Sequence, residues 1–416
     1  MRVVHTSDWH LGHTLRGEIT RDHEHRAFLD WLIETCAREA ADVLLITGDV
    51  FDSATPPASA ERMWFEFLAG VRGACPAIEI VVIAGNHDSP SRLGAPASVL
   101  RELAVHVVGG LPRAADGALD LERVLIPVAQ GRGLVAAVPF LRPVDYPLAP
   151  ELEDPLDAIY GEVLAGARAR REPDQALIVM GHLYVAGADA AYLSERRVSI
   201  GGVESAPLRL FPPDIDYVAL GHIHRSQRVG RDTIRYAGAP IPLALDEARY
   251  HHQVAAIDFE AGRVADIRLL DIPRTVEIVR IPSRGAGTLA DVLAAIQALP
   301  PCADAADAAR PYLEVVVALD APEPRLRALI EAALDGKHPR LVYLHVEHTG
   351  DRASLGDRVV AQRLAELDPR DVFARMWARD HAEPPAPAVL VAFERLLAEV
   401  QGDANDPAAD RTRGSS

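Results

Sequence analysis

The sequence is poor in cysteine and has no long apolar run. It contains only three cysteines in 416 residues, Cys36, Cys75 and Cys302. Their odd number and wide spacing argue against a disulfide framework and favour a cytoplasmic location. No run of about 20 uninterrupted apolar residues occurs, so we expect no membrane span. The chain opens directly on an apolar, strand-like segment, and we therefore also expect no signal peptide.

Positive charge is scarce too, and nearly all of it is arginine. The formal net charge of −17 at pH 7 argues against non-specific nucleic-acid binding by the whole surface. It leaves open a local basic groove, or binding through metals and a partner. Arginine suits bidentate contacts with phosphate, but its abundance also fits a bias of genome composition, which we favour for most arginines. The 49% hydrophobic and 25% charged residues are ordinary for a globular protein of two or three domains.

Five apolar runs are each followed by aspartate, asparagine or histidine. The runs 2–7, 43–47, 80–84, 177–180 and 217–220 lead into Asp8-Trp9-His10, Gly48-Asp49, Gly85-Asn86-His87-Asp88, Gly181-His182 and Gly221-His222-Ile223-His224. Such a run is typical of a buried strand that presents a polar side chain at its tip. A single histidine after a strand is more often a satisfied polar residue than a ligand. Five such ends together predict a sheet edge lined with metal ligands.

The residue types at these ends suit a pair of divalent metals, which can clamp a phosphate and activate a water between them. Asp49 is the predicted bridge, because an ionised carboxylate offers oxygens to two cations. Residues at i and i+2 of an extended chain face the same side, as Asp8 with His10 would. Asn86 would bind without adding charge. The predicted ligands are Asp8, His10, Asp49, Asn86, His182, His222 and His224.

The ligand set also restricts the metal. Mixed nitrogen and oxygen donors favour Mn, Fe, Zn or Co over Ca. No cysteine stands among the predicted ligands, which argues against a structural zinc site.

Other polar residues beside the ligands have predicted supporting roles. His87 follows Asn86, and since adjacent side chains diverge, we predict that it faces the substrate, where it would protonate the leaving oxygen or stabilise charge. A structural hydrogen bond within the Asn-His-Asp turn is the alternative. Asp52 and Asp88 are predicted to orient the ligands or His87 from a second shell. His13 is a weaker candidate for a substrate contact.

The order of apolar patterns predicts an α/β domain over residues 1–273 and a second unit over 274–350. In the first we expect helices at 25–40, 58–72 and 155–171, strands at 105–108, 124–126 and 134–138, and mostly strand over 196–275. In the second we expect strands at 276–281, 312–319 and 340–347 and helices at 288–299 and 323–334. Residues 351–401 are predicted to be a linker followed by amphipathic helices at 369–378 and 387–400, and residues 402–416 a disordered tail.

The five blocks, in order, resemble those of the calcineurin-like metallophosphoesterase superfamily, D-x-H, G-D-x-x-D, G-N-H-D/E, G-H and G-H-x-H. Segments 5–12, 27–32, 219–225 and 235–242 are further similar to the nuclease subunits of a bacterial double-strand-break repair complex. One departure is Gly238-Ala239-Pro240, where the family often has Gly-Ser-Pro. The resemblance is strong over residues 1–272 and rests on layout beyond them.

The resemblance implies a sandwich of two β-sheets flanked by helices, with an α+β capping domain over 274–350 that helps to hold DNA. The C-terminal helices would bind an SbcC-type coiled-coil ATPase, although packing on their own domain is the alternative. The resemblance also implies two manganese ions. One would be held by Asp8, His10, Asp49 and His224, the other by Asp49, Asn86, His182 and His222, and His87 would be the catalytic histidine.

The implied activity is that of a DNA nuclease in replication and recombination. It would be an ATP-dependent 3'-5' exonuclease on double strands and an endonuclease on single strands and hairpins, working as a homodimer within a heterotetramer. Two alternatives stay open. A small-molecule phosphodiesterase or protein phosphatase on the same core would not need the residues after 273. A binding scaffold with a degenerate site is disfavoured by the complete ligand set.

Overall fold

The structure is a computed structural model that describes residues 1–17, 19–146, 155–189, 205–304 and 308–348, with scattered residues between 373 and 396. Met1–Leu141, Ala149–Val198 and Glu204–Thr349 form one compact unit, and Arg142–Leu148, Ser199–Val203 and Gly350–Ser416 form a second. Among the described residues, no helix combines the length and apolarity needed to cross a membrane.

Six strands form the first sheet, in the order β14-β13-β1-β4-β5-β6. Its parallel part consists of β1 (Arg2–Thr6), β4 (Val43–Thr47), β5 (Glu79–Ile83) and β6 (Val105–Val108). The antiparallel pair β13 (Gln253–Glu260) and β14 (Arg263–Asp271) extends it beyond β1. The continuous apolar runs of β1, β4 and β5 suit parallel strands that are covered on both faces.

Six further strands form the second sheet, in the order β11-β12-β10-β9-β8-β7. The strands β12 (Arg231–Tyr236), β10 (Tyr217–Gly221), β9 (Ala176–His182) and β8 (Gly133–Ala137) are parallel. The edge strands β11 (Gln227–Val229) and β7 (Leu125–Val128) are antiparallel to their neighbours.

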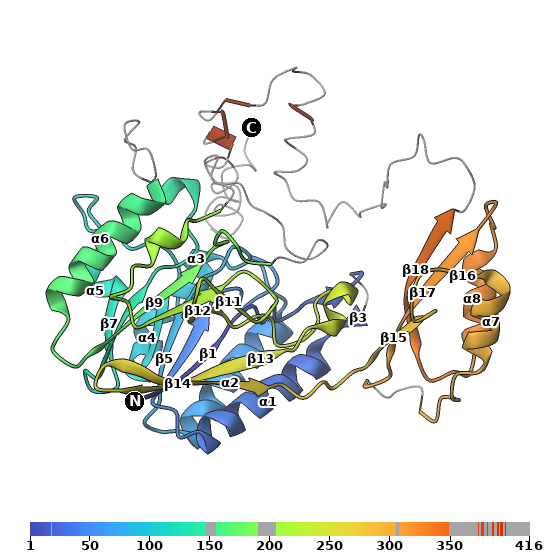
Figure 1. Ribbon diagram of the computed structural model, residues 1–416, viewed down its shortest axis with the longest axis horizontal. Coiled ribbons are helices and arrows are strands. Elements are labelled where there is room, and N and C mark those ends of the chain that lie inside the picture. Colours follow the sequence, from blue (N-terminus) through green and yellow to red (C-terminus); the bar gives the residue numbers. More distant parts are fainter. Residues whose placement is uncertain are drawn as a thin grey trace, which may run out of the picture. The chain divides into compact units, whose positions relative to one another are not determined.

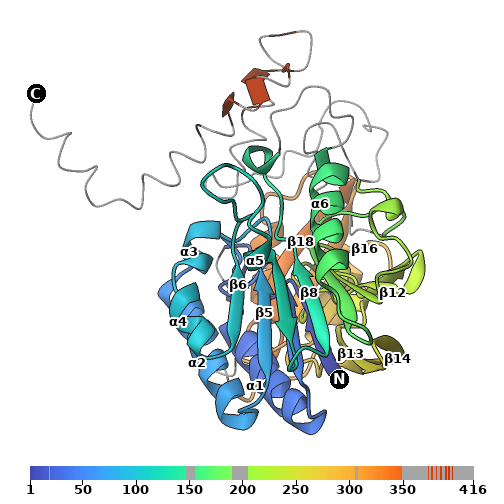
Figure 2. The same ribbon diagram turned by 90° about the vertical axis from the view of Figure 1, so that its left-hand side faces the viewer.

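The two sheets pack face to face, and helices cover their outer faces. Val3, Leu45 and Ile83 of the first sheet belong to the same apolar cluster as Ile178 and Ala219 of the second. On the other face of the first sheet lie α1 (Asp22–Arg38) and α2 (Ala58–Ala74), whose aromatic side chains surround Trp9. The helix α6 (Pro155–Arg170) contacts β7 and β8 (Figures 1 and 2). The predicted α/β sandwich is therefore confirmed.

Several boundaries differ from those predicted. The first helix begins at Asp22 rather than at 25, because Asp22 and Glu24 favour its first turn. Strand β12 ends at Tyr236, so residues 237–240 are loop and not strand. Gly238 has φ +81° there, and a Cβ on it would lie 2.7 Å from the His224 carbonyl oxygen. Several short elements were not predicted, among them the strands β2 (Thr14–Leu15) and β3 (Ile19–Thr20), which form a hairpin, and the helices α3 (Pro90–Gly94), α4 (Ala97–Glu102) and α5 (Leu121–Val124).

The predicted β-α-β-α-β pattern is present after residue 274. The strands β15 (Ile278–Ile281), β16 (Gly287–Thr288), β17 (Tyr312–Leu319) and β18 (Arg340–His348) form a sheet whose pairings are parallel. The helices α7 (Leu289–Gln297) and α8 (Leu326–Leu334) pack on one face through Val292, Ile296 and Ile330. We call β15–β18 with α7 and α8 the capping unit. The domain boundaries themselves stay a prediction.

The capping unit contains Lys337, the single lysine of the chain. Its ammonium donates hydrogen bonds to the carbonyl oxygens of Gln297 and Leu299. It thereby satisfies carbonyl groups at the C-terminal end of α7, where a positive charge is favoured.

In the second compact unit, the described residues of both predicted C-terminal helices are helical. They are Phe373, Met376, Trp377, Val389, Leu390, Ala392, Phe393 and Leu396. The rings of Phe373 and Phe393 stack with their centroids 4.3 Å apart. The rest of the predicted helices 369–378 and 387–400, the linker and the tail 402–416 lie outside the described residues.

Candidate metal centre

The predicted ligands lie where parallel strands of both sheets end. Asp8 and His10 follow β1, Asp49 follows β4 and Asn86 follows β5, while His182 ends β9 and the two remaining histidines follow β10. Their ligand atoms converge within 4.8 Å in overlapping groups: Asp8 with His10 and His224, His10 with Asp49 and His87, and Asp49 with His182 and His222. The fold therefore brings all the predicted aspartate and histidine ligands together.

Asp49 and Asn86 lie between these groups. Asp49 Oδ2 is 3.3 Å from His182 Nε2 and 3.6 Å from His10 Nε2. The side-chain oxygen of Asn86 lies 3.0 Å from both His182 Nε2 and His222 Nδ1. Asp49 thus lies between the groups, and Asn86 lies beside His182 and His222.

The arrangement fits divalent cations. The buried Nε2 atom of His10 has no hydrogen-bond partner among the residues that the structure describes, and buried polar atoms without a partner are rare. The donors around it are imidazole nitrogens and carboxylate oxygens, the set that transition metals prefer to calcium. A cation bound here would give this nitrogen a partner, and Asp49 and the neighbouring imidazoles could bind the same cation.

The second ring nitrogen of three ligand histidines is fixed by a hydrogen bond. His10 Nδ1 lies 3.1 Å from Asp52 Oδ1, His224 Nδ1 lies 2.8 Å from Glu247 Oε1, and His182 Nδ1 lies 2.8 Å from the Thr47 carbonyl oxygen. Each acceptor favours a hydrogen on Nδ1 and leaves the Nε2 lone pair for a metal. The predicted supporting position of Asp52 agrees with this geometry.

Glu247 was missed by sequence reasoning. It lies in a 3₁₀ turn, Leu245–Arg249, and is fully buried. No motif surrounds it, and charged residues are common in such loops. Its burial, which is the informative property, follows only from the tertiary fold.

Asp88 joins the loops that follow β4 and β5. Its carboxylate accepts hydrogen bonds from the backbone N–H groups of Val50, Phe51 and Gly85 at 3.2, 2.9 and 2.9 Å. Burial and the nearby Asp49 charge raise the pKa of Asp88 to about 6 despite these donors. Asp88 therefore supports the loop that carries Asn86, in keeping with its predicted supporting role.

His13 is used differently from its suggested substrate contact. Its Nδ1 lies 3.0 Å from Asp52 Oδ1 and its Nε2 lies 3.1 Å from the Leu243 carbonyl oxygen. Both ring nitrogens are occupied by the protein, so His13 supports the site rather than facing a substrate.

His87 is exposed, unlike the histidine ligands. Its backbone N–H donates to Asp49 Oδ1 at 2.8 Å, and its Nδ1 lies 2.8 Å from the Asp52 carbonyl oxygen. A carbonyl oxygen only accepts, so Nδ1 carries a hydrogen and Nε2 is the atom that can exchange a proton. The ring centroid is 4.7 Å from that of His10, which places His87 beside the ligands.

Four of the site residues have left-handed backbone conformations. Asp8, His10, Asp49 and His222 have φ values of +53°, +49°, +49° and +96°. Such residues each cost roughly 1–3 kcal/mol and cluster at functional sites. Hydrogen bonds from the backbone N–H group hold two of them: Asp8 donates to the Gly48 carbonyl oxygen at 3.0 Å, and His222 donates to the side-chain oxygen Asp8 Oδ1 at 2.9 Å.

The charges in the cluster keep Asp49 ionised. Burial opposes ionisation, but His182 and His87 lower the pKa of Asp49 well below its ordinary value. In return, although burial opposes protonation of His182, the Asp49 carboxylate raises the pKa of that imidazole to about 9. Burial and the neighbouring His182 lower the pKa of His222 to about 3. An ionised Asp49 is the form that a metal requires.

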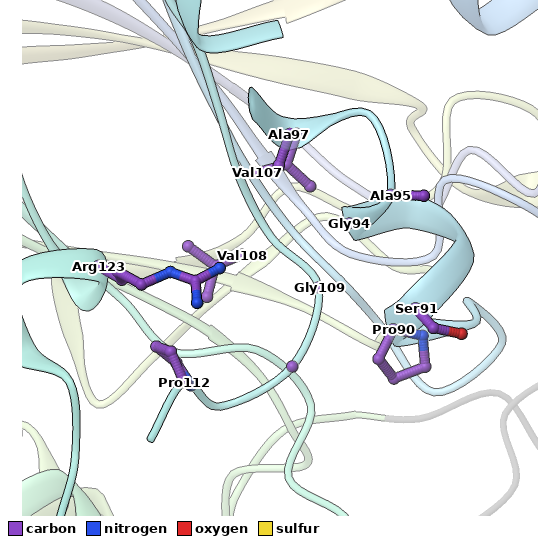
Figure 3. A pocket seen from close by; sticks show the side chains of 11 residues that line it. Pro90, Ser91, Gly94, Ala95, Ala97, Val107, Val108, Gly109, Pro112 and Arg123 are labelled. Carbon is purple, nitrogen blue, oxygen red and sulfur yellow. The ribbon is translucent and has the colours of Figure 1, made fainter. Parts of the chain in front are cut away.

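A separate cavity of about 280 Å³ lies beside α3. Figure 3 shows the Arg123 guanidinium group next to Val108, with Pro112 on the same side of the cavity and Pro90 and Ser91 opposite. None of the predicted ligands lines it, so the metal centre is distinct from this cavity.

Two family models match parts of the chain. Residues 1–226 match the family model of calcineurin-like phosphoesterases, and residues 274–381 match a model described as the type 5 capsule protein repressor C-terminal domain. Among solved structures, TT1561 of Thermus thermophilus has a TM-score of 0.39 and 12% identity, covering 65% of this chain and 99% of that one.

Curated relatives match over much of their own length. The SbcD subunit of the nuclease SbcCD from Rhodobacter capsulatus is 40% identical over 388 residues, which cover 90% of this chain and 94% of the relative. The proteins of the same name from Escherichia coli K12 and Bacillus subtilis are both 34% identical. They cover 66% and 64% of this chain, and 69% and 68% of their own length.

Proposed function

The chain belongs to the calcineurin-like phosphoesterase family, among the relatives of the SbcD subunit of the nuclease SbcCD, and we propose that it is the nuclease subunit of an ATP-dependent DNA repair complex. It would be a metal-dependent phosphodiesterase that acts in DNA replication and recombination. The observation that carries this proposal is the convergence of aspartate, asparagine and histidine side chains at the strand ends of both sheets.

Two divalent cations fit these side chains, and Mn²⁺ is the proposed ion. Asp8, His10, Asp49 and His224 would hold one, and Asp49, Asn86, His182 and His222 the other. When bound, the two cations would neutralise phosphate charge and lower the pKa of an attacking water. Asp49 would contribute the carboxylate that both cations share. The hydrogen bonds at Nδ1 of His10, His182 and His224 keep the Nε2 atom of each ring directed at the metal centre.

His87 would supply the proton for the leaving oxygen. The Asp52 carbonyl oxygen holds the hydrogen of Nδ1, so a second proton on Nε2 would be the one donated. Its backbone hydrogen bond to Asp49 fixes the ring beside the ligands. The same imidazolium would also offset negative charge on the phosphorane.

The resemblance, together with the names of the relatives, supports a finer proposal. We propose Mn²⁺-dependent 3'-5' exonuclease action on double-stranded DNA and endonuclease action on single strands and hairpins, made ATP-dependent by an SbcC-type coiled-coil ATPase. A homodimer within a heterotetramer and a cytoplasmic location belong to the same proposal. The net charge of −17 is compatible with it if the ATPase provides most of the contacts with DNA.

The C-terminal helices are the proposed ATPase contact. Their described residues include Met376, Leu390 and Leu396, large apolar side chains that are exposed. Apolar residues on a short helix suit recognition in a groove of a partner.

Cleavage of a labelled DNA hairpin in Mn²⁺ tests the proposal. The wild-type chain should cut the hairpin, and Asp49→Asn should not, because the amide cannot supply two anionic oxygens. Asp258→Asn is a matched control, since Asp258 pairs with Arg2 away from the ligands. Adding the coiled-coil ATPase should make cleavage depend on ATP. Failure of the wild-type chain to cut in any of these conditions would contradict the proposal.

A small-molecule phosphodiesterase is the second candidate, because the same centre suits any phosphodiester. It predicts turnover of bis(p-nitrophenyl) phosphate without a partner, at a rate that DNA does not inhibit. Inhibition by hairpin DNA would favour the nuclease.

A further inference from the structure

We propose that the capping unit sets the affinity of one of the two metal sites, the one around Asp8, His10 and His224, through buried contacts that begin at Tyr312. The inference rests on the proposed two-metal function. Both ends of the path lie in the same compact unit, which runs through Glu204–Thr349 and includes the start of the chain.

The path begins with a buried ion pair beneath the capping unit. The Tyr312 hydroxyl, on β17, donates to Glu24 Oε2 at 2.7 Å. Glu24, on α1, is bound by the guanidinium group of Arg21, with Nη2 2.8 Å from Oε1. These side chains are only 1–2% exposed. A buried charge pair is costly to break, so Tyr312 and Arg21 are held in a fixed relation.

Arg21 then reaches the loop that leads to Glu247. Its Nη1 donates to the Pro242 carbonyl oxygen at 2.7 Å, and His13 Nε2 contacts the next carbonyl oxygen, of Leu243, at 3.1 Å. The Leu243 N–H donates to Glu247 Oε2 at 2.8 Å. The position of this short segment therefore depends on Arg21, and it determines where the Glu247 carboxylate lies.

Both branches end on imidazoles of the same metal group. Glu247 Oε1 holds His224 Nδ1 at 2.8 Å. On the other branch, His13 and His10 share Asp52 Oδ1 at 3.0 and 3.1 Å. Hydrogen-bond partners of metal-bound histidines orient the rings and tune affinity.

The second metal group lacks this connection. His182 Nδ1 bonds to the Thr47 carbonyl oxygen at the end of β4, and His222 Nδ1 contacts the Asn86 side chain. A displacement of the capping unit would therefore act more directly on the site around Asp8, His10 and His224 than on the other. Arg21, Glu24, Tyr312 and Glu247 are thus assigned as positioning residues.

A second attachment of the capping unit provides the control. The Arg16 guanidinium group lies over the Tyr343 ring at 5.2 Å, and its Nη1 donates to the Val342 carbonyl oxygen at 3.2 Å. Neither contact touches Arg21, Glu24 or the 242–247 loop. Arg16→Met removes this attachment and leaves the hydrogen bond from Tyr312 to Glu24 in place.

A titration of the full chain with Mn²⁺ tests the inference without measuring activity. Electron paramagnetic resonance reports the concentration of free Mn²⁺ at each point. The wild-type chain should bind two ions. Tyr312→Phe removes one hydroxyl and should weaken one of them about fivefold, a modest coupling factor. Glu247→Gln should weaken the same ion about ten- to hundredfold. Arg16→Met should bind as wild type.

The outcomes separate the two proposals. Two ions bound with unchanged affinity in Tyr312→Phe would overturn the inference and leave the proposed function intact. Equal weakening in Tyr312→Phe and Arg16→Met would also overturn it, because the path through Arg21 would not be the cause. A wild-type chain that binds no Mn²⁺ would contradict the proposed function itself.

Hydrogen exchange keeps the inference testable if Tyr312→Phe does not fold. Coupling between two sites is reciprocal, so Mn²⁺ should slow amide exchange in β17 of the wild-type chain. The strand β7, at the far edge of the second sheet, is the reference within the same molecule. Unchanged exchange in β17 on Mn²⁺ binding would overturn the inference.

Discussion

His87 and the ligands next to it can be separated by experiment because their contacts differ. His87→Gln removes the proton-exchanging Nε2 but none of the proposed metal donors. We expect kcat on hairpin DNA to fall by about 10²–10⁴-fold, the usual contribution of a general acid or base. Steady-state kinetics in saturating Mn²⁺ measures this.

The matched readout is Mn²⁺ stoichiometry, which should stay at two ions in His87→Gln. If His87→Gln bound one Mn²⁺ ion fewer than the wild-type chain, besides having a lower kcat, His87 would be identified as a ligand, which contradicts its predicted role.

His5 links the two sheets and should contribute to acid sensitivity. It is fully buried, with Nδ1 3.0 Å from the Tyr217 hydroxyl and Nε2 3.0 Å from Thr47 Oγ1. Burial lowers the pKa of His5 to about 3, below the ordinary value. The unfolded chain therefore binds the extra proton, so the stabilising contribution is complete above the ordinary value of about 6.5 and is lost as pH falls towards 3.

His5→Gln should flatten the dependence of the free energy of unfolding on pH. We expect the slope between pH 6 and 4 to fall by up to about 1.4 kcal/mol per pH unit. Urea unfolding of both proteins in EDTA measures the slope without a contribution from metal release. Identical slopes would contradict the assigned pKa direction.

At single residues, the sequence pattern located the side chains that converge at the strand ends better than the residues that support them. Asp8, Asp49 and Asn86 follow apolar runs within recognisable motifs, so local pattern was sufficient. Glu247 supports His224 from 23 residues away along the chain. It lies in a loop with no periodic pattern, and only the folded chain brings it to the imidazole.

The backbone packs closely at the end of β10, and a substitution at Gly221 tests how much this packing matters. A Cβ on Gly221, the last residue of β10, would lie 1.9 Å from the Thr47 carbonyl oxygen and 2.8 Å from His182 Nδ1. Gly221→Ala must therefore push the end of β10 away from the end of β4. We expect a loss of about 2 kcal/mol or more in the free energy of unfolding, with weaker Mn²⁺ binding.

Gly161→Ala is the matched control, because its added Cβ in α6 would meet none of the described atoms within 4 Å. It should stabilise the chain by about 0.5–1 kcal/mol through helix propensity. Chemical denaturation of both variants tests the pair, and a Gly221→Ala protein as stable as wild type would refute the close-packing argument.

Among the elements, length decided what the sequence could predict. The long amphipathic helices α1, α2 and α6 and the strands β4, β5 and β17 carry enough periodic positions to be recognised. The helices α3 and α4 span five and six residues, too few turns to show a period. The end of β12 depends on the contact of Gly238 with residues 224–226, which no local pattern contains.

For the assembled complex, the exposed apolar residues of the C-terminal segment should govern partner binding. Leu396 is 59% exposed, so Leu396→Glu should leave the stability of the catalytic unit unchanged. It should weaken binding to the coiled-coil ATPase by about tenfold or more, since a buried unpaired charge is costly at an interface. Co-purification and Mn²⁺ binding, measured together, distinguish this from misfolding. Undiminished ATPase binding would exclude Leu396 from the contact.

For the molecule as a whole, the change from metal-type motifs to a plain β-α-β-α-β pattern near residue 274 was legible from sequence. The attachment of the two parts was not, because Tyr312 lies nearly 300 residues along the chain from Glu24 and Arg21. In the sequence, each of these residues looks like an ordinary strand or helix residue. The buried contact of Tyr312 with the pair of Arg21 and Glu24 exists only in the folded chain.

The hydrogen-bonded Lys337 has a practical consequence. It is the single lysine of the sequence, and the Met1 amine lies 3.0 Å from the Phe259 carbonyl oxygen, so the sequence as given offers two primary amines. Reagents that couple to amines above pH 8 would label the capping unit at one site and the start of β1 at another. A fluorophore pair placed this way would report the separation of the capping unit from the sandwich during a catalytic cycle, without any engineered cysteine.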